Sequence, residues 1–237
     1  MIRVDLDARV LADRYRAELC VLSDIGAFCD AVLPKISKRP PAWSAEELAV
    51  ARHRFRAQVD AELPGILAWT DALMEAVPED TFFVSDMTQF AYKAKELCVL
   101  RAPRRWIHPY GFGTLGYALP AAIGAKIGRG DGPVLAIAGD YGFQYTSQEI
   151  AVAVEHRLSL PILLWDNNGL GEIAEAMVRA QVPPRAVTAL NPNFEALAAA
   201  YGALSETLEQ PEALAGALDR AFAHPGPTLL RLKAGTP

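Results

Sequence analysis

Short apolar runs in the second half of the chain predict buried strands. Each run consists mostly of aliphatic and aromatic residues, and such runs are typical of parallel strands that helices cover on both faces. The runs cover residues 81–85, 134–138, 161–165 and 228–232. Residues 2–6 instead alternate apolar and charged positions, which also indicates a strand.

Helical periodicity separates these runs. Residues 44–77 show a helical pattern that starts at Ser44, a typical N-cap, and breaks at Pro64-Gly65. Thr146-Ser147-Gln148-Glu149 matches a capping box, so a helix is predicted to open there. Further helices are predicted at residues 171–180, 194–201 and 211–223. The alternation predicts an α/β fold, a doubly wound parallel sheet with helices on both faces, whose ligand lies at the carboxyl ends of the strands.

The first 40 residues have a different organisation. Two amphipathic stretches follow the strand at residues 2–6 and reach Leu33-Pro34. Residues 35–41 are polar and contain two prolines, which is typical of a linker. We therefore expect a domain boundary near residue 40, with residues 41–237 forming the main domain.

Composition excludes some classes of partner. The 23 basic and 28 acidic residues give a net charge of −5, which disfavours binding to nucleic acid. The three cysteines, Cys20, Cys29 and Cys98, are too far apart for a zinc clip or a redox pair, so we interpret them as buried apolar residues in a reducing compartment. No apolar run approaches the roughly 20 residues of a membrane span, and the N-terminus has no apolar signal core. A cytoplasmic protein with no membrane partner is expected.

Two polar loops follow the predicted strands at 134–138 and 161–165. The first is Gly139-Asp140-Tyr141-Gly142 and the second is Asp166-Asn167-Asn168-Gly169-Leu170-Gly171. Asp140 offers a carboxylate, Asn167 a carboxamide oxygen and Gly169 a backbone carbonyl. Magnesium prefers such oxygen ligands and often takes further ones from phosphate groups. The sequence therefore predicts a metal site of Asp140, Asn167 and Gly169 beside a bound diphosphate.

These loops resemble the diphosphate motif of thiamine-diphosphate-dependent enzymes. Residues 111–126 are similar to the segment of acetolactate synthases and 2-oxo-acid decarboxylases that lies under the cofactor rings. The resemblance implies a thiamine-diphosphate-binding fold with thiamine diphosphate and Mg²⁺ as cofactors. It also implies that the Gly113 carbonyl accepts a hydrogen bond from the aminopyrimidine, and that Leu115 is an apolar wedge that keeps the cofactor bent. The implied cofactor-binding residues are Gly113, Leu115, Gly139, Asp140, Tyr141, Gly142, Asn167, Gly169 and Leu170.

The loop after the strand at 81–85 gives a further candidate. Its residues Thr88 and Gln89 either bind the diphosphate or form a hydrogen-bonded turn, and we include Gln89 among the candidate cofactor-binding residues.

The resemblance also implies the class of reaction. The cofactor attacks a 2-oxo acid, carbon dioxide leaves, and the remaining fragment either takes up a proton or joins a second carbonyl compound. In the family a catalytic glutamate comes from a separate pyrimidine-binding domain, which this chain lacks. Residues 1–34 resemble the end of the family's middle domain, so the chain corresponds to about the last 40% of a family member. We therefore expect a split-enzyme subunit or a fragment that assembles with a pyrimidine-binding domain or subunit as a homo- or hetero-oligomer.

Departures from the motif leave alternatives open. Tyr141 replaces a glycine, as in glyoxylate carboligases, and Asp166 replaces an asparagine. Together with the missing glutamate, Tyr141 makes a non-catalytic regulatory or scaffold subunit the competing interpretation. Asp140 and Asn167 are also typical turn residues, and His108 is either a proton donor or a histidine outside the site.

A dinucleotide site is a further alternative. Gly111, Gly113 and Gly116 spell G-x-G-x-x-G, but a poor strand precedes them and the turn Gly130-Asp131-Gly132 stands where a second strand would end. We therefore disfavour a nicotinamide or flavin cofactor.

Overall fold

The computed structural model describes residues 1–12, 16–188 and 190–234. Its internal contacts divide the chain into two units, Met1–Arg52 and His53–Pro237. This division lies inside a helix, α3 (Ala45–Glu62), whereas the sequence places a boundary near residue 40. The assignment of residues 1–40 to the remnant of a middle domain stays a prediction.

The N-terminal unit contains a two-stranded parallel sheet. Strand β1 pairs with β2, and Ile2 lies opposite Leu19. The elements are β1 (Ile2–Asp5), α1 (Ala8–Leu11), β2 (Leu19–Leu22), α2 (Ile25–Val32) and the 3-10 helix η1 (Leu33–Lys35). Cys20 and Cys29 are exposed here, and Cys98 in the second unit is only partly buried. The interpretation of the cysteines as buried is therefore wrong for Cys20 on β2 and Cys29 on α2, because this small unit buries no residue of either element.

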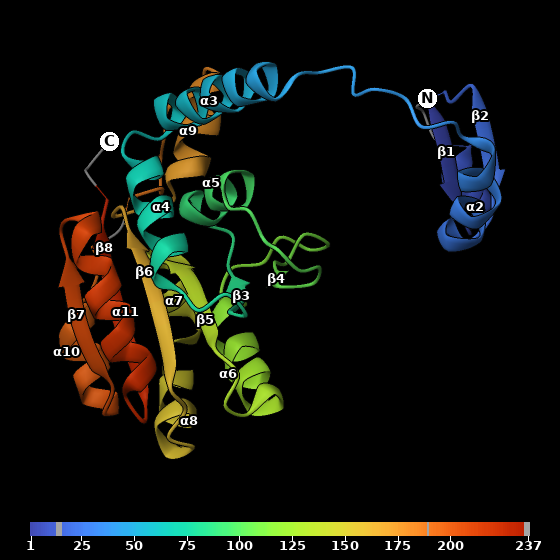
Figure 1. Ribbon diagram of the computed structural model, residues 1–237. Helices are drawn as coiled ribbons and strands as arrows, with labels where there is room; N and C mark the ends of the chain where they lie inside the picture. Colours follow the sequence, from blue (N-terminus) through green and yellow to red (C-terminus); the bar gives the residue numbers. More distant parts are fainter. Residues whose placement is uncertain (13–15, 189, 235–237) are drawn as a thin grey trace. The chain divides into compact units, whose positions relative to one another are not determined.

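The second unit is built on a parallel sheet, as the sequence predicts, and this sheet has six strands (Figure 1). The strand order is β4-β3-β5-β6-β8-β7, and every described pair is parallel. The strands are β3 (Phe82–Ser85), β4 (Trp106–Ile107), β5 (Val134–Gly139), β6 (Leu160–Asp166), β7 (Leu204–Leu208) and β8 (Pro227–Lys233). The four central strands are those that the apolar runs predict.

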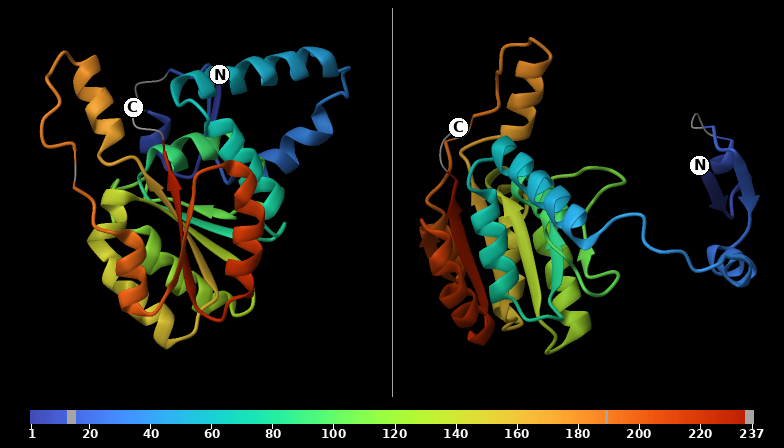
Figure 2. Two further views of the ribbon diagram at one scale, coloured as in Figure 1. Left: turned by 90° about the vertical axis from the view of Figure 1, so that its left-hand side faces the viewer. Right: turned by 45° about the horizontal axis from the view of Figure 1, so that its top comes forward.

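Helices cover both faces of this sheet. One core lies between the sheet and the helices α4 (Ile66–Ala76), α5 (Gln89–Leu97) and α11 (Leu214–Ala223). The other lies against α6 (Ala118–Arg129), α7 (Asp140–Thr146), α8 (Ile150–Glu155) and α10 (Phe194–Tyr201). The left view of Figure 2 shows α4 and α11 on one side of the sheet and α10 on the other. The remaining elements are η2 (Ser147–Glu149), α9 (Gly171–Arg179) and η3 (Pro211–Ala213).

Local sequence signals explain several helix ends. Ser44 Oγ accepts a hydrogen bond from the Glu47 amide, and Glu47 Oε2 accepts one from the Ser44 amide, which is a capping box at the start of α3. Gly65 and Gly202 adopt left-handed φ angles of 86° and 87° before α4 and after α10. Within the described residues, no helix combines the length and the apolar character that a membrane span requires.

The capping box expected at Thr146 is a wrong prediction. The preceding helix α7 already begins at Asp140, directly after β5, and only a short 3-10 turn separates it from α8. Thr146 makes no side-chain cap and donates its Oγ1 hydrogen to the carbonyl of Gly116, 3.1 Å away. A tertiary hydrogen bond therefore takes the place of the local one.

Leucine substitutions test the position of the core. Leu163 on β6 is 1% exposed and Leu204 on edge strand β7 is 52% exposed. Leu163→Ala should lower the free energy of unfolding by about 2–5 kcal/mol, because it leaves a cavity. The matched change Leu204→Ala should cost less than about 1 kcal/mol. Urea unfolding followed by tryptophan fluorescence measures both, and equal costs would contradict this placement of the core.

Candidate active site

Three buried carboxylates mark the carboxyl edge of the sheet. Asp86 follows β3, Asp140 follows β5 and Asp166 ends β6, and these strands are neighbours. The three residues are only 1%, 1% and 2% exposed. A buried carboxylate is costly unless donors or a cation compensate it, so the loops around these residues must supply hydrogen bonds.

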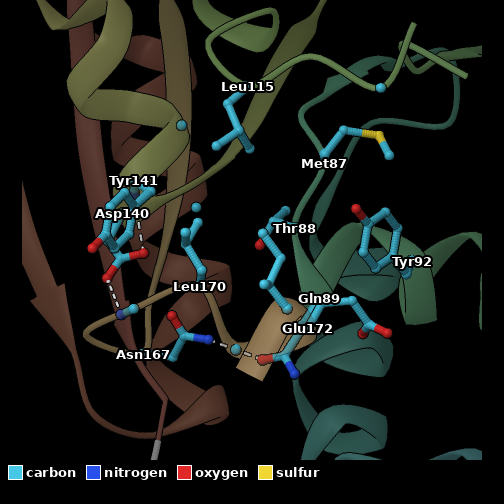
Figure 3. A pocket seen from close by; sticks show the side chains of 16 residues that line it. Met87, Thr88, Gln89, Tyr92, Leu115, Asp140, Tyr141, Asn167, Leu170 and Glu172 are labelled. Carbon is cyan, nitrogen blue, oxygen red and sulfur yellow. Dashed lines mark hydrogen bonds between the residues drawn. The ribbon is translucent and has the colours of Figure 1, made fainter. Parts of the chain in front are cut away.

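A pocket of about 260 Å³ opens at this edge, beside Asp140. All of the residues that the sequence assigns to cofactor or metal binding line it, and Figure 3 shows several of their side chains facing one space. They are Gln89, Gly113, Leu115, Gly139, Asp140, Tyr141, Gly142, Asn167, Gly169 and Leu170. The fold thus brings together segments from four loops, while the individual roles of these residues stay predictions.

The carboxylate of Asp140 accepts three hydrogen bonds. The Tyr141 amide donates to Oδ1 at 2.8 Å, the Gly169 amide to Oδ2 at 2.9 Å and the Asn191 side-chain amide to Oδ2 at 2.7 Å. Burial nevertheless raises the pKa of Asp140 above its ordinary value. In the described part of the chain Asp140 has no ion-pair partner, so a bound cation would stabilise its charged form.

A neighbouring glutamine orients Asn167. The Asn167 side-chain amide donates to Gln89 Oε1 at 2.9 Å, and Gln89 Nε2 donates to Glu175 Oε1 at 2.6 Å. The carboxamide oxygen of Asn167 therefore lies on the side of the pocket toward Asp140 (Figure 3). Gly171 permits this contact, because a Cβ there would lie 2.5 Å from Gln89 Oε1.

The donor set fits a magnesium–diphosphate group. Asp140, Asn167 and the Gly169 carbonyl offer hard oxygen ligands from two neighbouring loops, and magnesium would complete its shell with phosphate oxygens. Gly142 keeps the first loop close to the sheet, because a Cβ there would lie 2.2 Å from Asp86 Oδ2. Tyr141 lines the same pocket, and its backbone amide holds Asp140. Tyr141 therefore contributes its backbone amide to the site, as a glycine there would.

Sequence reasoning missed the role of Asp86. Its Oδ2 accepts a hydrogen bond from the Gly116 amide at 2.9 Å, and its Oδ1 accepts one from the Tyr117 amide at 3.1 Å. Burial raises the pKa of Asp86, and these backbone hydrogen bonds oppose the shift. The two bonds fix the loop that presents Gly113 and Leu115 to the pocket. Its position directly after a predicted strand was the available signal.

Sequence reasoning also missed the group behind Asp140. Arg231 on β8 donates its Nε hydrogen to Asp166 Oδ2 at 2.7 Å, and its Nη1 lies 3.1 Å from Glu195 Oε1. Asn191 donates to both Asp140 and Asp166, at 2.7 and 2.8 Å. Arg231 therefore supplies the counter-charge for Asp166, and Asn191 couples that ion pair to Asp140.

His108 lies outside the pocket wall. Its Nδ1 is 2.9 Å from Ser85 Oγ, and Ser85 Oγ accepts a hydrogen bond from Trp106 Nε1 at 2.7 Å. Its Nε2 is buried and has no hydrogen-bond partner among the described residues. Burial, with a smaller contribution from Lys95, lowers the pKa of His108 to about 4. This placement favours a histidine outside the site over a proton donor.

Comparison with known proteins identifies the class of this domain. Residues 86–232 match the family model for the thiamine pyrophosphate enzyme C-terminal TPP-binding domain. The matched segment runs from the buried Asp86 to the end of the sheet and contains both polar loops. The chain therefore belongs to this family of diphosphate-binding domains, whose cofactors are thiamine diphosphate and usually Mg²⁺.

Individual relatives agree with this assignment. A probable 2-ketoarginine decarboxylase from Pseudomonas aeruginosa is 38% identical over 98% of this chain and 42% of its own length. The large subunit of acetolactate synthase isozyme 1 from Escherichia coli is 25% identical over the same shares. Benzoylformate decarboxylase from Polynucleobacter necessarius shares the fold, with a TM-score of 0.74 at 20% identity over 98% of this chain and 44% of that chain. The chain thus spans about 40% of the length of the curated relatives it matches.

The shifted titration of His108 predicts a pH-dependent stability. Its folded pKa of about 4 lies below the ordinary 6.5, so its contribution is complete above pH 6.5 and is lost as the pH falls toward 4. The loss should be on the order of 2 kcal/mol, since the ring is only partly buried. Urea unfolding from pH 7 to pH 4.5 should show a flatter profile for His108→Gln than for the unmodified chain. His53→Gln, on an exposed part of α3, should keep the steep profile, and a steep profile in His108→Gln would contradict the assignment.

Proposed function

We propose that this chain is the thiamine-diphosphate- and magnesium-binding part of an enzyme that acts on 2-oxo acids. The observation that carries the proposal is the convergence of Asp140, Asn167 and the Gly113–Leu115 loop on one pocket. A separate pyrimidine-binding domain or subunit would complete the site. The competing interpretation, a scaffold subunit, is not favoured, because the relatives that match this chain are decarboxylases and acetolactate synthases and because hydrogen bonds hold the side chains of Asp140 and Asn167 at the pocket.

Each group of residues has a defined task in this proposal. Asp140, Asn167 and the Gly169 carbonyl would hold magnesium, and the glycine backbones of the first loop would approach the diphosphate. Leu115 and Met87 would form an apolar wall for the cofactor rings. When bound, thiamine diphosphate supplies the nucleophilic carbon that adds to the 2-oxo acid and takes up its electron pair as carbon dioxide leaves.

The relatives that match this chain suggest two possible outcomes of the reaction, decarboxylation and carboligation. Both a decarboxylase and acetolactate synthases match this chain. Assays should therefore follow carbon dioxide, aldehyde and hydroxy-ketone products in parallel. Pyruvate and 2-ketoarginine are the first substrates to compare, since the second is named for the 38% identical relative.

Exposed apolar residues around the pocket support the need for a partner. Phe112 is 93% exposed and Tyr110 is 75% exposed on the loop before α6, while Ile173 and Val178 on α9 are 49% and 61% exposed. Large apolar side chains gathered beside a ligand pocket are typical of an interface. We propose that the pyrimidine-binding partner covers them and contributes the catalytic glutamate.

Removing the metal ligand tests the cofactor assignment. Asp140→Ala should abolish magnesium-dependent binding of thiamine diphosphate, because it deletes the charged member of the proposed metal site. Leu115→Ala should retain most of the binding and lower turnover, since it alters only the shape of the wall. Calorimetric titration with and without a chelator measures the first effect, with Asp131→Ala in an exposed turn as the control. Unchanged affinity in Asp140→Ala would refute the metal assignment.

The partner face predicts assembly. Obligate interfaces bury about 2,000 Å² or more, so the assembled protein should protect residues 169–180 from hydrogen exchange. Ile173→Glu should weaken assembly in size-exclusion chromatography with light scattering. Ile127→Glu on α6 should not, although Ile127 is similarly exposed, 55% against 49%. A strictly monomeric chain with strong protection of residues 169–180 would contradict the need for a partner.

A further inference from the structure

The pocket has two ends that differ in their chemistry. Asp140 and Asn167 lie at one end, and Glu172 and Tyr92 lie at the other (Figure 3). Among the described residues that line the pocket, none is a lysine, an arginine or a histidine. If Asp140 holds the metal, Glu172 remains as a second negative charge in the wall, and its ion-pair partner Arg179 is not part of that wall.

The start of α9 fixes the position of Glu172. Gly171 is the first helical residue, and Gln89 and Asn167 lie so close to it that no side chain fits there. Glu172 is therefore in the first turn of α9, where the helix dipole stabilises a carboxylate. Its side chain is 45% exposed, so a ligand can reach it.

Tyr92 places an aromatic ring beside this carboxylate (Figure 3). Burial raises the pKa of the Tyr92 phenol, and the charge of Glu172 adds to the shift. Lys95 Nζ lies 5.5 Å from the centroid of this ring but 4.1 Å from that of Tyr110, so Tyr110 is the main aromatic partner of Lys95. A carboxylate next to an aromatic face suits a planar guanidinium, which forms paired hydrogen bonds with the first and stacks on the second.

Neighbouring cations hold Glu172 only weakly. Arg179 Nη2 lies 3.3 Å from Glu172 Oε1, but the Arg179 side chain is 61% exposed and such pairs contribute little. The charge of Glu172 also contributes to raising the pKa of Lys93, although the main partner of Lys93 is Glu62. The nearby Glu175 is already engaged by Gln89 Nε2 and by Arg179. Glu172 is thus the acidic group that a positively charged ligand in the pocket can engage most easily.

We propose that Glu172, assisted by the ring of Tyr92, binds a guanidinium group at the far end of the substrate. This inference rests on the proposed function, in which the 2-oxo end of the substrate meets the cofactor. Glu172 is then a specificity-determining residue, and the enzyme prefers 2-oxo acids with a cationic side chain over neutral ones of the same shape.

The test compares 5-guanidino-2-oxopentanoate with 5-ureido-2-oxopentanoate, which has nearly the same shape but an uncharged side chain. The assembled enzyme should favour the guanidino acid in kcat/KM, and Glu172→Gln should reduce this preference about 10- to 100-fold. Tyr92→Phe should retain most of the preference, and Tyr92→Leu should reduce it. Glu155→Gln on α8, which lies outside the pocket wall, should leave the ratio unchanged.

A second measurement does not depend on turnover. Calorimetric titration of both acids into the full chain with Mg²⁺ and without thiamine diphosphate should show the same preference and the same effect of Glu172→Gln. Equal binding of the two acids, or a preference that survives in Glu172→Gln, would overturn the inference. Turnover of pyruvate without discrimination would overturn the inference and support the proposed function. If the protein binds the guanidino acid in preference to the ureido acid, but the assembled protein turns over no 2-oxo acid, the inference would be supported and the proposed function would be refuted.

Discussion

The site depends on the burial of three carboxylates at one edge of a parallel sheet. Asp86, Asp140 and Asp166 end neighbouring strands, and each must find donors where water is excluded. Asp86 takes two backbone amides from the loop before α6, and Asp166 takes the guanidinium of Arg231. Asp140 also takes hydrogen bonds alone, without an opposite charge among the described residues, and unlike Asp86 it lines the pocket. The same constraint therefore shapes the loops and leaves one carboxylate without a counter-charge at the pocket, where we propose that magnesium binds.

The fold could be predicted largely because its central strands are covered on both faces. Continuous apolar runs indicated β3, β5, β6 and β8, whereas the edge strands gave no such signal. Strand β4 has only two residues, and β7 carries polar residues on its half-covered surface. Helical structure begins directly after Thr146, but the expected capping box does not form, because the Thr146 hydroxyl donates to a carbonyl of a distant loop. The pattern of apolar residues indicates which positions are buried, but it does not indicate which group a polar side chain will hydrogen-bond.

The site could be predicted to the extent that its residues follow strands in two compact motifs. Asp140 and Asn167 are such residues, and the sheet brings their loops together. Asn191 and Arg231 do not belong to these motifs. Arg231 reaches Asp166 because of the register of β8 against β6, and Asn191 reaches Asp140 and Asp166 from a distant loop. Glu172 needed the structure as well, since its relation to Tyr92 is set by where α9 begins.

The contact between Gly142 and Asp86 makes positions 86, 116 and 142, which are far apart in the sequence, depend on one another. Any side chain at position 142 would collide with the Asp86 carboxylate, and loss of that carboxylate would release the amides of Gly116 and Tyr117. Gly116 is itself confined, because a Cβ there would lie 2.9 Å from Tyr145 Cβ. The effects of substitutions at positions 86, 116 and 142 on stability are therefore expected to be non-additive. Libraries that randomise the cofactor loops should vary these positions together, since each single change meets an environment that the other two still fix.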